Sequence, residues 1–517
     1  MKKTMSFYPL KHLALSSSLI AFIALNGCST PPKHSKESSA PPKTEAVSAV
    51  ELLKTTPPPQ LNAEELTTLS DIELELQMAT AQQQAQWPNF ILLNHQLWQT
   101  AGDSGQAQIE QSIWDTISRQ PLEQIKTTIQ TLKQHPNTSV QQWGELLAIL
   151  KGPAEDLHKK LERLNNSNSD AIYMHHLLPG FTMQNIYVPP PKQIAVLLPF
   201  EGKYQHVANQ IKTGIMKAFM ASDQNILLKF YNAGALDEVE QTYQQAKLEG
   251  ADFVIGPLRK EAIDRLLTTA DENVLALNNI GYAPFTQFSY KSADEVSQLI
   301  RHFNAKNYQN IGILSSDSAG NTKLAHALKT AWLQTEGHSA VLSIYPDKKP
   351  KLRQALGALI NEETSKERYN TLRWSTGQKL KFFPRPRQDF DAIVIIDNPA
   401  RMAVFKPQFA FFELNTPVYG TSQLSPKTLQ NISPNHDLAG VQFLAHPVVF
   451  QPNDLNSNFE AFGWDSFQVA TQLHNLRFGG YLSQGKTGEL TLEDQQIKQN
   501  LIWATYDKKG ELIPLSE

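Results

Sequence analysis

The second part of the chain alternates apolar runs with amphipathic segments, and this pattern limits its fold more than any other feature. The run QIAVLLPF at 193–200 is apolar almost throughout, as expected of a strand buried on both faces of a parallel sheet. Val207, Ile211 and Ile215 then recur every four residues and mark one helical face. Repeated alternation of this kind predicts a doubly wound α/β architecture. We expect strands at 193–200, 226–231, 252–257, 274–280, 310–316, 340–346, 390–397 and 417–422, separated by helices.

A change in this pattern near 285–295 predicts two lobes with a cleft between them. Ligands of open parallel sheets usually sit in the loops at the carboxyl ends of the strands. In those loops Tyr204 and Tyr231 would stack on a ligand, and Lys203 would meet a carboxylate. We favour the alternative, a vestigial cleft that side chains fill. The candidate residues for the cleft are Lys203, Tyr204, Tyr231, Asn232 and Asn278.

The preceding block, residues 61–185, has the pattern of a helical domain. Ile109, Ile113 and Ile117 lie four residues apart on one face, and the stretch WGELLAIL at 143–150 repeats that spacing. We expect several paired, tetratricopeptide-like helices, in which the tryptophans pack in the core rather than line a peptide groove. The rigid run Pro189-Pro190-Pro191 marks the boundary, so the α/β domain is expected to span 190–517.

The start of the chain carries export and anchoring signals. Residues 1–27 combine a lysine-containing start with an apolar run, which is typical of a secretory signal peptide. The run ends in Leu-Asn-Gly-Cys, which resembles the lipobox of bacterial lipoproteins, so Cys28, the single cysteine, is predicted to be lipidated. Ser29 is not aspartate, and the resemblance to that class then implies sorting to the outer membrane rather than the inner. Residues 28–60 are rich in Pro, Ser and Lys and are predicted to form an extended, disordered tether.

Composition argues against several classes of function. The formal net charge is −3, and removal of 1–27 with its three lysines gives −3 − 3 = −6. Such a chain is a poor binder of nucleic acid, which needs clustered Lys and Arg. We expect no metal site, since one cysteine and the adjacent His175 and His176 do not provide one. Asp391, Asp397 and Asp465 are scattered, so we expect no catalytic residues and no cofactor.

The stretch GYLSQGKTGEL at 480–490 contains the signature of a phosphate-binding loop and two signatures of β-lactamase active sites. A phosphate-binding loop follows a strand and opens a helix, whereas this stretch follows a helical pattern at 458–478 and precedes a strand pattern at 489–493. We therefore expect its N–H groups not to form a phosphate nest. In β-lactamases the two lysine motifs lie on separate elements, but here Lys486 serves both. The stretch is predicted to be a structural turn in which Gly485 and Gly488 take positive φ.

Several stretches together resemble the penicillin-binding protein activator LpoA family. They occur in the family's order and cover roughly residues 85–515. The α/β part resembles the type I periplasmic-binding-protein fold. The matching stretches are QIAVLLPFEGKY, VIGPLRKEAI, VLALNNI, DAIVIIDNPARMAVFKPQFAFF, PVYGTSQLS, FGWDSFQVA and GKTGELTLE, with SIWDTISRQPLEQI and QQWGELLAIL in the helical part.

The resemblance implies a lipoprotein of the outer membrane that faces the periplasm and is not an enzyme. Its implied partner is a class A penicillin-binding protein, a bifunctional peptidoglycan synthase that it would activate. Two alternatives remain open. One is a lipoprotein solute-binding receptor with a ligand in the inter-lobe cleft, and the other is a glycan-binding or scaffold protein without effect on synthesis.

Overall fold

The computed structural model of the chain describes residues 71–515 except 155–156, 168–169, 184–189, 291–293, 382–386, 431 and 452–453. Residues 61–517 form one compact unit. The predicted signal peptide, Cys28 and the tether at 28–60 lie outside the described residues. None of the helices described is both long enough and apolar enough to cross a lipid bilayer.

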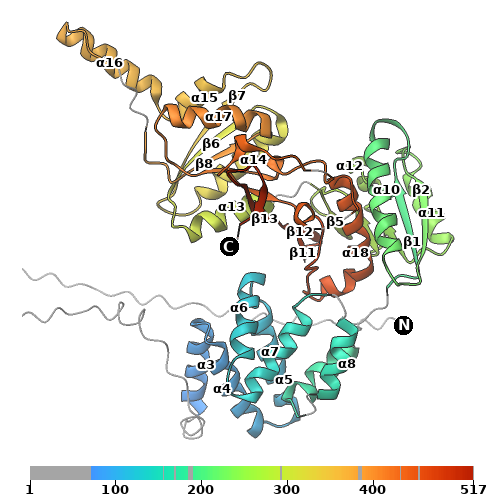
Figure 1. The fold of residues 1–517 in the computed structure, drawn as a ribbon. Coiled ribbons are helices and arrows are strands. Elements are labelled where there is room, and N and C mark those ends of the chain that lie inside the picture. The colour runs from blue at the N-terminus through green and yellow to red at the C-terminus, as the bar shows by residue number, and fades with distance from the viewer. Residues whose placement is uncertain are drawn as a thin grey trace, which may run out of the picture. The chain divides into compact units, whose positions relative to one another are not determined.

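The first lobe is built on a sheet whose described strands have the order β11-β12-β5-β4-β3-β1-β2 (Figure 1). Neighbouring strands from β2 through to β12 run parallel, and β11 pairs with β12 antiparallel. The strands are β1 (Gln193–Leu198), β2 (Leu227–Asn232), β3 (Phe253–Ile255), β4 (Val274–Ala276), β5 (Thr286–Phe288), β11 (Glu489–Glu493) and β12 (Gln496–Asn500). The helices are α10 (Gln205–Met220), α11 (Val239–Leu248), α12 (Lys260–Leu266) and α18 (Asn458–Arg477).

The second lobe repeats this order as β14-β13-β10-β9-β8-β6-β7. It is parallel from β7 to β10, and β13 and β14 join antiparallel. The strands are β6 (Asn310–Ser316), β7 (Ser339–Tyr345), β8 (Ala392–Ile396), β9 (Val418–Gly420), β10 (Gln442–Ala445), β13 (Ile502–Tyr506) and β14 (Leu512–Pro514). The helices are α13 (Asp294–Ala305), α14 (Ala319–Trp332), α15 (Leu352–Leu359), α16 (Glu362–Thr376) and α17 (Pro399–Phe411).

The chain passes between the two sheets at three places: from β5 to α13, from β10 to α18, and from β12 to β13. Two similar lobes joined by several crossings form the two-lobed, type I periplasmic-binding-protein architecture that the sequence predicts. The first crossing falls inside the predicted region of change, 285–295. The fold class, a helical part followed by a doubly wound α/β part, is therefore confirmed.

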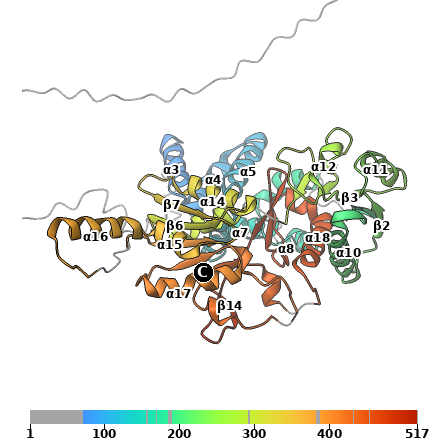
Figure 2. The same cartoon turned by 90° about the horizontal axis from the view of Figure 1, so that it is seen from above.

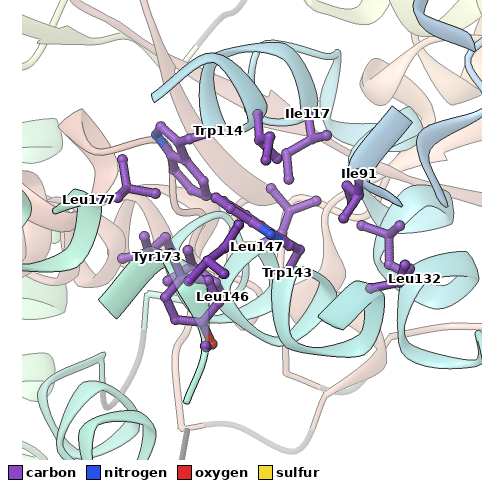
Figure 3. Close-up of a cluster of buried hydrophobic side chains, with 14 of the residues drawn as sticks. Ile91, Trp114, Ile117, Leu132, Trp143, Leu146, Leu147, Tyr173 and Leu177 are labelled. Carbon is purple, nitrogen blue, oxygen red and sulfur yellow. The ribbon is translucent and has the colours of Figure 1, made fainter. Parts of the chain in front are cut away.

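The helical part owes its stability to one buried cluster (Figure 3). Trp114 and Trp143 are 5% and 1% exposed, so these two tryptophans pack in the core as predicted. Leu146 and Leu147 from the same helix as Trp143 are fully buried beside them. The helices are α3 (Asp71–Gln83), α4 (Trp87–Thr100), α5 (Asp103–Ser118), α6 (Leu122–Lys133), α7 (Thr138–Leu150), α8 (Leu157–Ser167) and α9 (Leu177–Met183). A tetratricopeptide-like repeat within them stays a prediction.

The segment after α18 joins the helical part to the first lobe. Tyr481 forms backbone hydrogen bonds with both Gly152 and Ala154, at 3.2 and 2.8 Å. Lys126 of α6 donates to the Glu489 carboxylate of β11 at 2.8 Å, and its ammonium also lies over the Tyr481 ring. These contacts join residues that are more than 300 positions apart in the sequence, so the helical part and the first lobe share an interface.

Helices α10 and α18 of the first lobe touch backbone to backbone because each contributes a glycine. A Cβ at Gly463 would lie 2.1 Å from the carbonyl oxygen of Ile211, and a Cβ at Gly214 would lie 1.8 Å from that of Glu460. Real Cβ atoms do not approach a carbonyl so closely, so the crossing depends on both glycines.

We expect Gly463→Ala to lower the free energy of unfolding by about 1–3 kcal/mol, since the added methyl must push α10 and α18 apart. Gly320→Ala in α14 is the matched control, because a Cβ there meets nothing within 4 Å. Alanine in a helix is favoured over glycine, so the control is expected to be neutral or up to about 1 kcal/mol stabilising. Urea unfolding of both variants measures these changes. Equal effects of the two substitutions would contradict the inference that α10 and α18 need glycine where they touch.

Candidate functional site

Arg259 links loops that follow the carboxyl ends of strands in the first sheet. Its guanidinium lies 5.4 Å from the ring centroid of Tyr204, which follows β1. Its NH1 group also donates to the carbonyl of Gly234, which follows β2, at 3.2 Å. Lys203 is exposed and packs its ammonium 5.6 Å from the Tyr204 ring. A role for Arg259 was not predicted, although a base two residues after the predicted strand 252–257 was a usable signal.

The remaining cleft candidates use their polar groups within the first lobe. Asn232 accepts from the Phe200 amide at 3.0 Å and so ties the loop after β2 to the loop after β1. Asn278 donates to the Leu258 carbonyl at 3.2 Å. The Tyr231 hydroxyl donates to Glu249 at 2.8 Å, and burial together with that carboxylate raises its pKa to about 12. The structure thus brings Tyr204 and Asn232 to one edge, while the Tyr231 hydroxyl is engaged by Glu249.

The corresponding edge of the second lobe holds an ion-pair cluster. Asp397, at the end of β8, accepts from the Tyr345 hydroxyl at 2.6 Å and from Arg401 at 2.9 Å. Arg401 also donates to Asp347 at 2.6 Å. The Asp397 side chain is almost completely buried, so these partners compensate the loss of its hydration. The backbone amide of Asn398 also donates to Asp397 at 2.7 Å, and this set of internal partners suits a structural role at the end of β8.

Other groups with catalytic or ligating chemistry are also engaged. Asp391 accepts from the backbone amides of Gln309 and Asn310 at 2.7 and 2.8 Å. His176 lies 3.5 Å from Asp103, while the ring of His175 packs against Trp98. Within the described residues, no group of three His, Cys, Asp or Glu side chains is arranged to hold a metal ion.

The loop that carries the phosphate-loop signature surrounds a carboxylate from the protein itself. Asp465, in the middle of α18, accepts from the amides of Lys486 and Thr487 at 2.8 and 2.7 Å. The Thr487 hydroxyl donates to the same carboxylate at 2.6 Å. Asp465 and Thr487 are both fully buried. Two successive N–H groups and a hydroxyl therefore converge on an anion that is part of the fold.

This geometry refines two expectations about the loop. Its position between α18 and β11 is confirmed, and α18 ends just before Gly479, which has a φ of 92°. Two of its N–H groups converge on the Asp465 carboxylate of α18, and the prediction that they do not form a phosphate nest stays a prediction. The expectation of a positive φ at Gly485 was wrong: a Cβ there would lie 2.0 Å from the Gly488 oxygen, so close backbone approach explains this glycine.

The same loop contacts the crossing from β10 to α18. The Lys486 carbonyl accepts from the Val448 amide at 3.1 Å, and the Lys486 ammonium donates to the Gln451 side chain at 2.8 Å. The ring Nδ1 of His446 lies 2.9 Å from the Thr487 carbonyl. Burial lowers the pKa of His446, which favours the neutral ring with Nδ1–H donating to that carbonyl.

Asp465 titrates at an unusual pH for an aspartate. Burial raises its pKa to about 6, although the hydrogen bonds from Thr487 and Lys486 oppose that rise. An unfolded aspartate has a pKa of about 3.9. Between these two values the folded protein holds a proton that the unfolded chain releases. The contribution of Asp465 to stability is therefore greatest below about pH 4 and decreases as the pH rises through 6.

We expect Asp465→Asn to remove this pH dependence, because the amide does not titrate. The free energy of unfolding of the natural protein minus that of the variant should fall by up to about 3 kcal/mol between pH 4 and pH 7. Urea unfolding of both proteins across that range measures the difference. A difference that stays constant or increases with pH would show that burial does not raise the pKa of Asp465.

The chain was compared with known proteins at the level of family, sequence and fold. The family model described as "LppC putative lipoprotein" matches residues 60–509. A Photobacterium profundum protein named penicillin-binding protein activator LpoA is 26% identical over 449 residues, which cover 79% of this chain and 71% of that protein. A Vibrio cholerae protein of the same name is 23% identical, covering 70% of this chain and 66% of that protein.

Among solved structures, LpoA of Haemophilus influenzae superimposes with a TM-score of 0.60 at 17% sequence identity. That match covers 88% of this chain and 84% of the other and supports the fold. A second crystal structure, of full-length LpoA from the same organism, gives a TM-score of 0.55. The relatives named LpoA confirm the resemblance that the sequence predicts. Since the family model extends over most of its length, the chain belongs to the LppC lipoprotein family.

Proposed function

We propose that this protein is an outer-membrane lipoprotein that binds a class A penicillin-binding protein and activates it, and so regulates peptidoglycan synthesis. The observation that carries the proposal is the match to proteins named penicillin-binding protein activator LpoA along 70–79% of the chain. In this proposal the protein acts by binding the synthase and is not itself an enzyme. The agreement in fold with Haemophilus influenzae LpoA supports the same role.

The chemistry of the two sheet edges supports action by contact. In the first lobe Asn232 and Asn278 are used to join neighbouring loops. In the second lobe Asp397 is neutralised by Arg401 and hydrogen-bonded to Tyr345. Polar groups engaged in this way are poorly placed to exchange partners with a small ligand, so the solute-receptor alternative has less support than the activator.

Activation by binding requires only that the protein bind the active state of the synthase more tightly than the inactive state. A difference in binding free energy of about 1 kcal/mol raises the population of the active state about fivefold when that state is minor. A lipid at Cys28 would fix the protein at the outer membrane. The 32 residues that follow, 29–60, would span about 100 Å if extended at ~3.1 Å per residue. That reach would bring the body across the periplasm to an inner-membrane synthase.

We expect the purified protein to increase glycan polymerisation, peptide cross-linking or both by a purified class A synthase of the same cell, by about fivefold at saturation. A two-lobed solute-binding protein from another family is the control for nonspecific effects. Failure to stimulate any class A synthase of the cell would remove the proposal. A saturable rise in melting temperature with an amino acid or a muropeptide would instead favour the receptor.

Anchoring is tested separately. Mass spectrometry of the amino-terminal peptide is expected to show a diacylglyceryl group on Cys28 and an amino terminus at that residue. Cys28→Ala should leave the protein unlipidated and out of the outer-membrane fraction. Ser29→Asp should shift it to the inner membrane, whereas the matched change Ser29→Ala should not. An unmodified Cys28 in the mature protein would contradict the anchor.

A further inference from the structure

Helix α16 forms an arm that leaves the second lobe. In both views it extends away from the sheet of β6, β7 and β8 (Figures 1 and 2). None of its 15 residues is buried. A helix of this length that buries nothing is only marginally stable by itself, and tertiary packing usually supplies most of the stability of a helix in a protein. The arm therefore contributes little to the core of the lobe.

The base of the arm is nevertheless fixed. Arg353 of α15 donates to Glu362, the first residue of α16, at 2.9 Å, and its guanidinium lies 4.9 Å from the Phe411 ring centroid. Gly357 allows this approach, since a Cβ there would lie 2.6 Å from the Glu362 carboxylate. Asn361, with a φ of 59°, makes the turn between α15 and α16. The arm is thus held at a defined angle to α15.

The far end of the arm is a short hairpin. Gly377 ends α16 with a φ of 63°, and its amide donates to the Arg373 carbonyl. The chain then turns back, and the Tyr369 hydroxyl donates to the Leu380 carbonyl at 3.0 Å. Residues 368–381, here called the arm tip, therefore form an ordered surface on both sides of Gly377.

The arm tip is strongly basic in an acidic protein. Residues 368–381 contain two arginines, two lysines and no acid, so their formal charge is +4, against −3 for the whole chain. The four bases are all exposed, and none forms an ion pair in the part of the chain that the structure describes. They are Arg368, Arg373, Lys379 and Lys381. Unpaired like charges close together repel one another, and an acidic surface would relieve that repulsion.

Two large apolar side chains accompany these bases. Trp374 is 87% exposed and Leu372 is 54% exposed. Exposed Trp next to Arg is the composition of residues that dominate protein–protein interfaces. Trp374 and Leu372 are two positions apart, which places them about 200° apart around the helix. They do not form the single apolar face that a helix lying in a membrane surface needs, so a protein pocket suits them better than lipid.

We propose that the arm tip is a docking surface for an acidic patch on a protein, with Trp374 inserted into an apolar pocket within that patch. This inference rests on the proposed function for the identity of that protein, the class A penicillin-binding protein. Charge attraction would speed the encounter, and burial of Trp374 would slow dissociation. The defined angle of the arm would fix where the synthase sits relative to the second lobe.

The test compares the affinity of full-length variants for the purified synthase. Trp374→Ala should weaken binding about tenfold or more, as expected when an interface anchor is lost. The double variant Arg373→Glu, Lys379→Glu should weaken it similarly and should make the affinity less dependent on salt. Matched controls are Tyr282→Ala, an aromatic residue that is 88% exposed in the first lobe, and Lys323→Glu, an exposed base of α14. Both controls should stay within about twofold of the natural protein.

Circular dichroism of the variants excludes unfolding, which is not expected because no residue of α16 is buried. If the natural protein binds and stimulates the synthase and the arm variants do so equally well, the docking inference is wrong and the proposed function stands. If the natural protein neither binds nor stimulates the synthase, the proposed function is wrong, and so is the docking inference that rests on it. Trp374-dependent binding to vesicles of phosphatidylglycerol and phosphatidylethanolamine, with unchanged binding to the synthase, would overturn the inference in favour of a lipid surface.

Discussion

The hydrogen bonds from the Lys486 and Thr487 amides to the Asp465 carboxylate are the interaction on which much of this architecture depends. Asp465 is fully buried, and an isolated carboxylate in such a place would be very unfavourable. The loop after α18 compensates by directing two amides and the Thr487 hydroxyl at it. Once the loop is fixed there, its carbonyl groups hold Val448 and His446 of an inter-lobe crossing. The buried Asp465 carboxylate thereby fixes α18, the loop that follows it, and the passage of the chain from β10 to α18 relative to one another.

The same stretch of chain reaches the helical part. Tyr481, five residues before Lys486, pairs with the backbone on either side of Pro153, and Glu489 then meets Lys126. The stretch from Tyr481 to Glu489 thus contacts the helical part, the first lobe and a crossing to the second lobe within nine residues. A protein that acts by presenting surfaces to a partner needs such surfaces held in register. The docking proposed for the basic arm tip, at residues 368–381, would depend on that rigidity.

Much of the fold follows from local pattern, and the exceptions have physical reasons. Strands β6 and β11 agree with the expected ranges 310–316 and 489–493 because apolar content or alternation marks them. Helix α16 was not predicted, since it buries no residue and so carries no apolar stripe. The role of Asp465 was also missed, because its partners lie 21 residues or more away beyond a helix end. Sequence shows which segments are buried, but it does not show which buried polar groups meet.

The central claim is that the loop around Asp465 is a rigid part of the core and not a surface turn. Native-state hydrogen exchange of residues 485–488 tests this most directly. The account predicts that the Lys486 and Thr487 amides exchange as slowly as those of the buried strand β1, which open only when the first lobe unfolds. Exchange as fast as in an exposed loop such as 346–351 would contradict it.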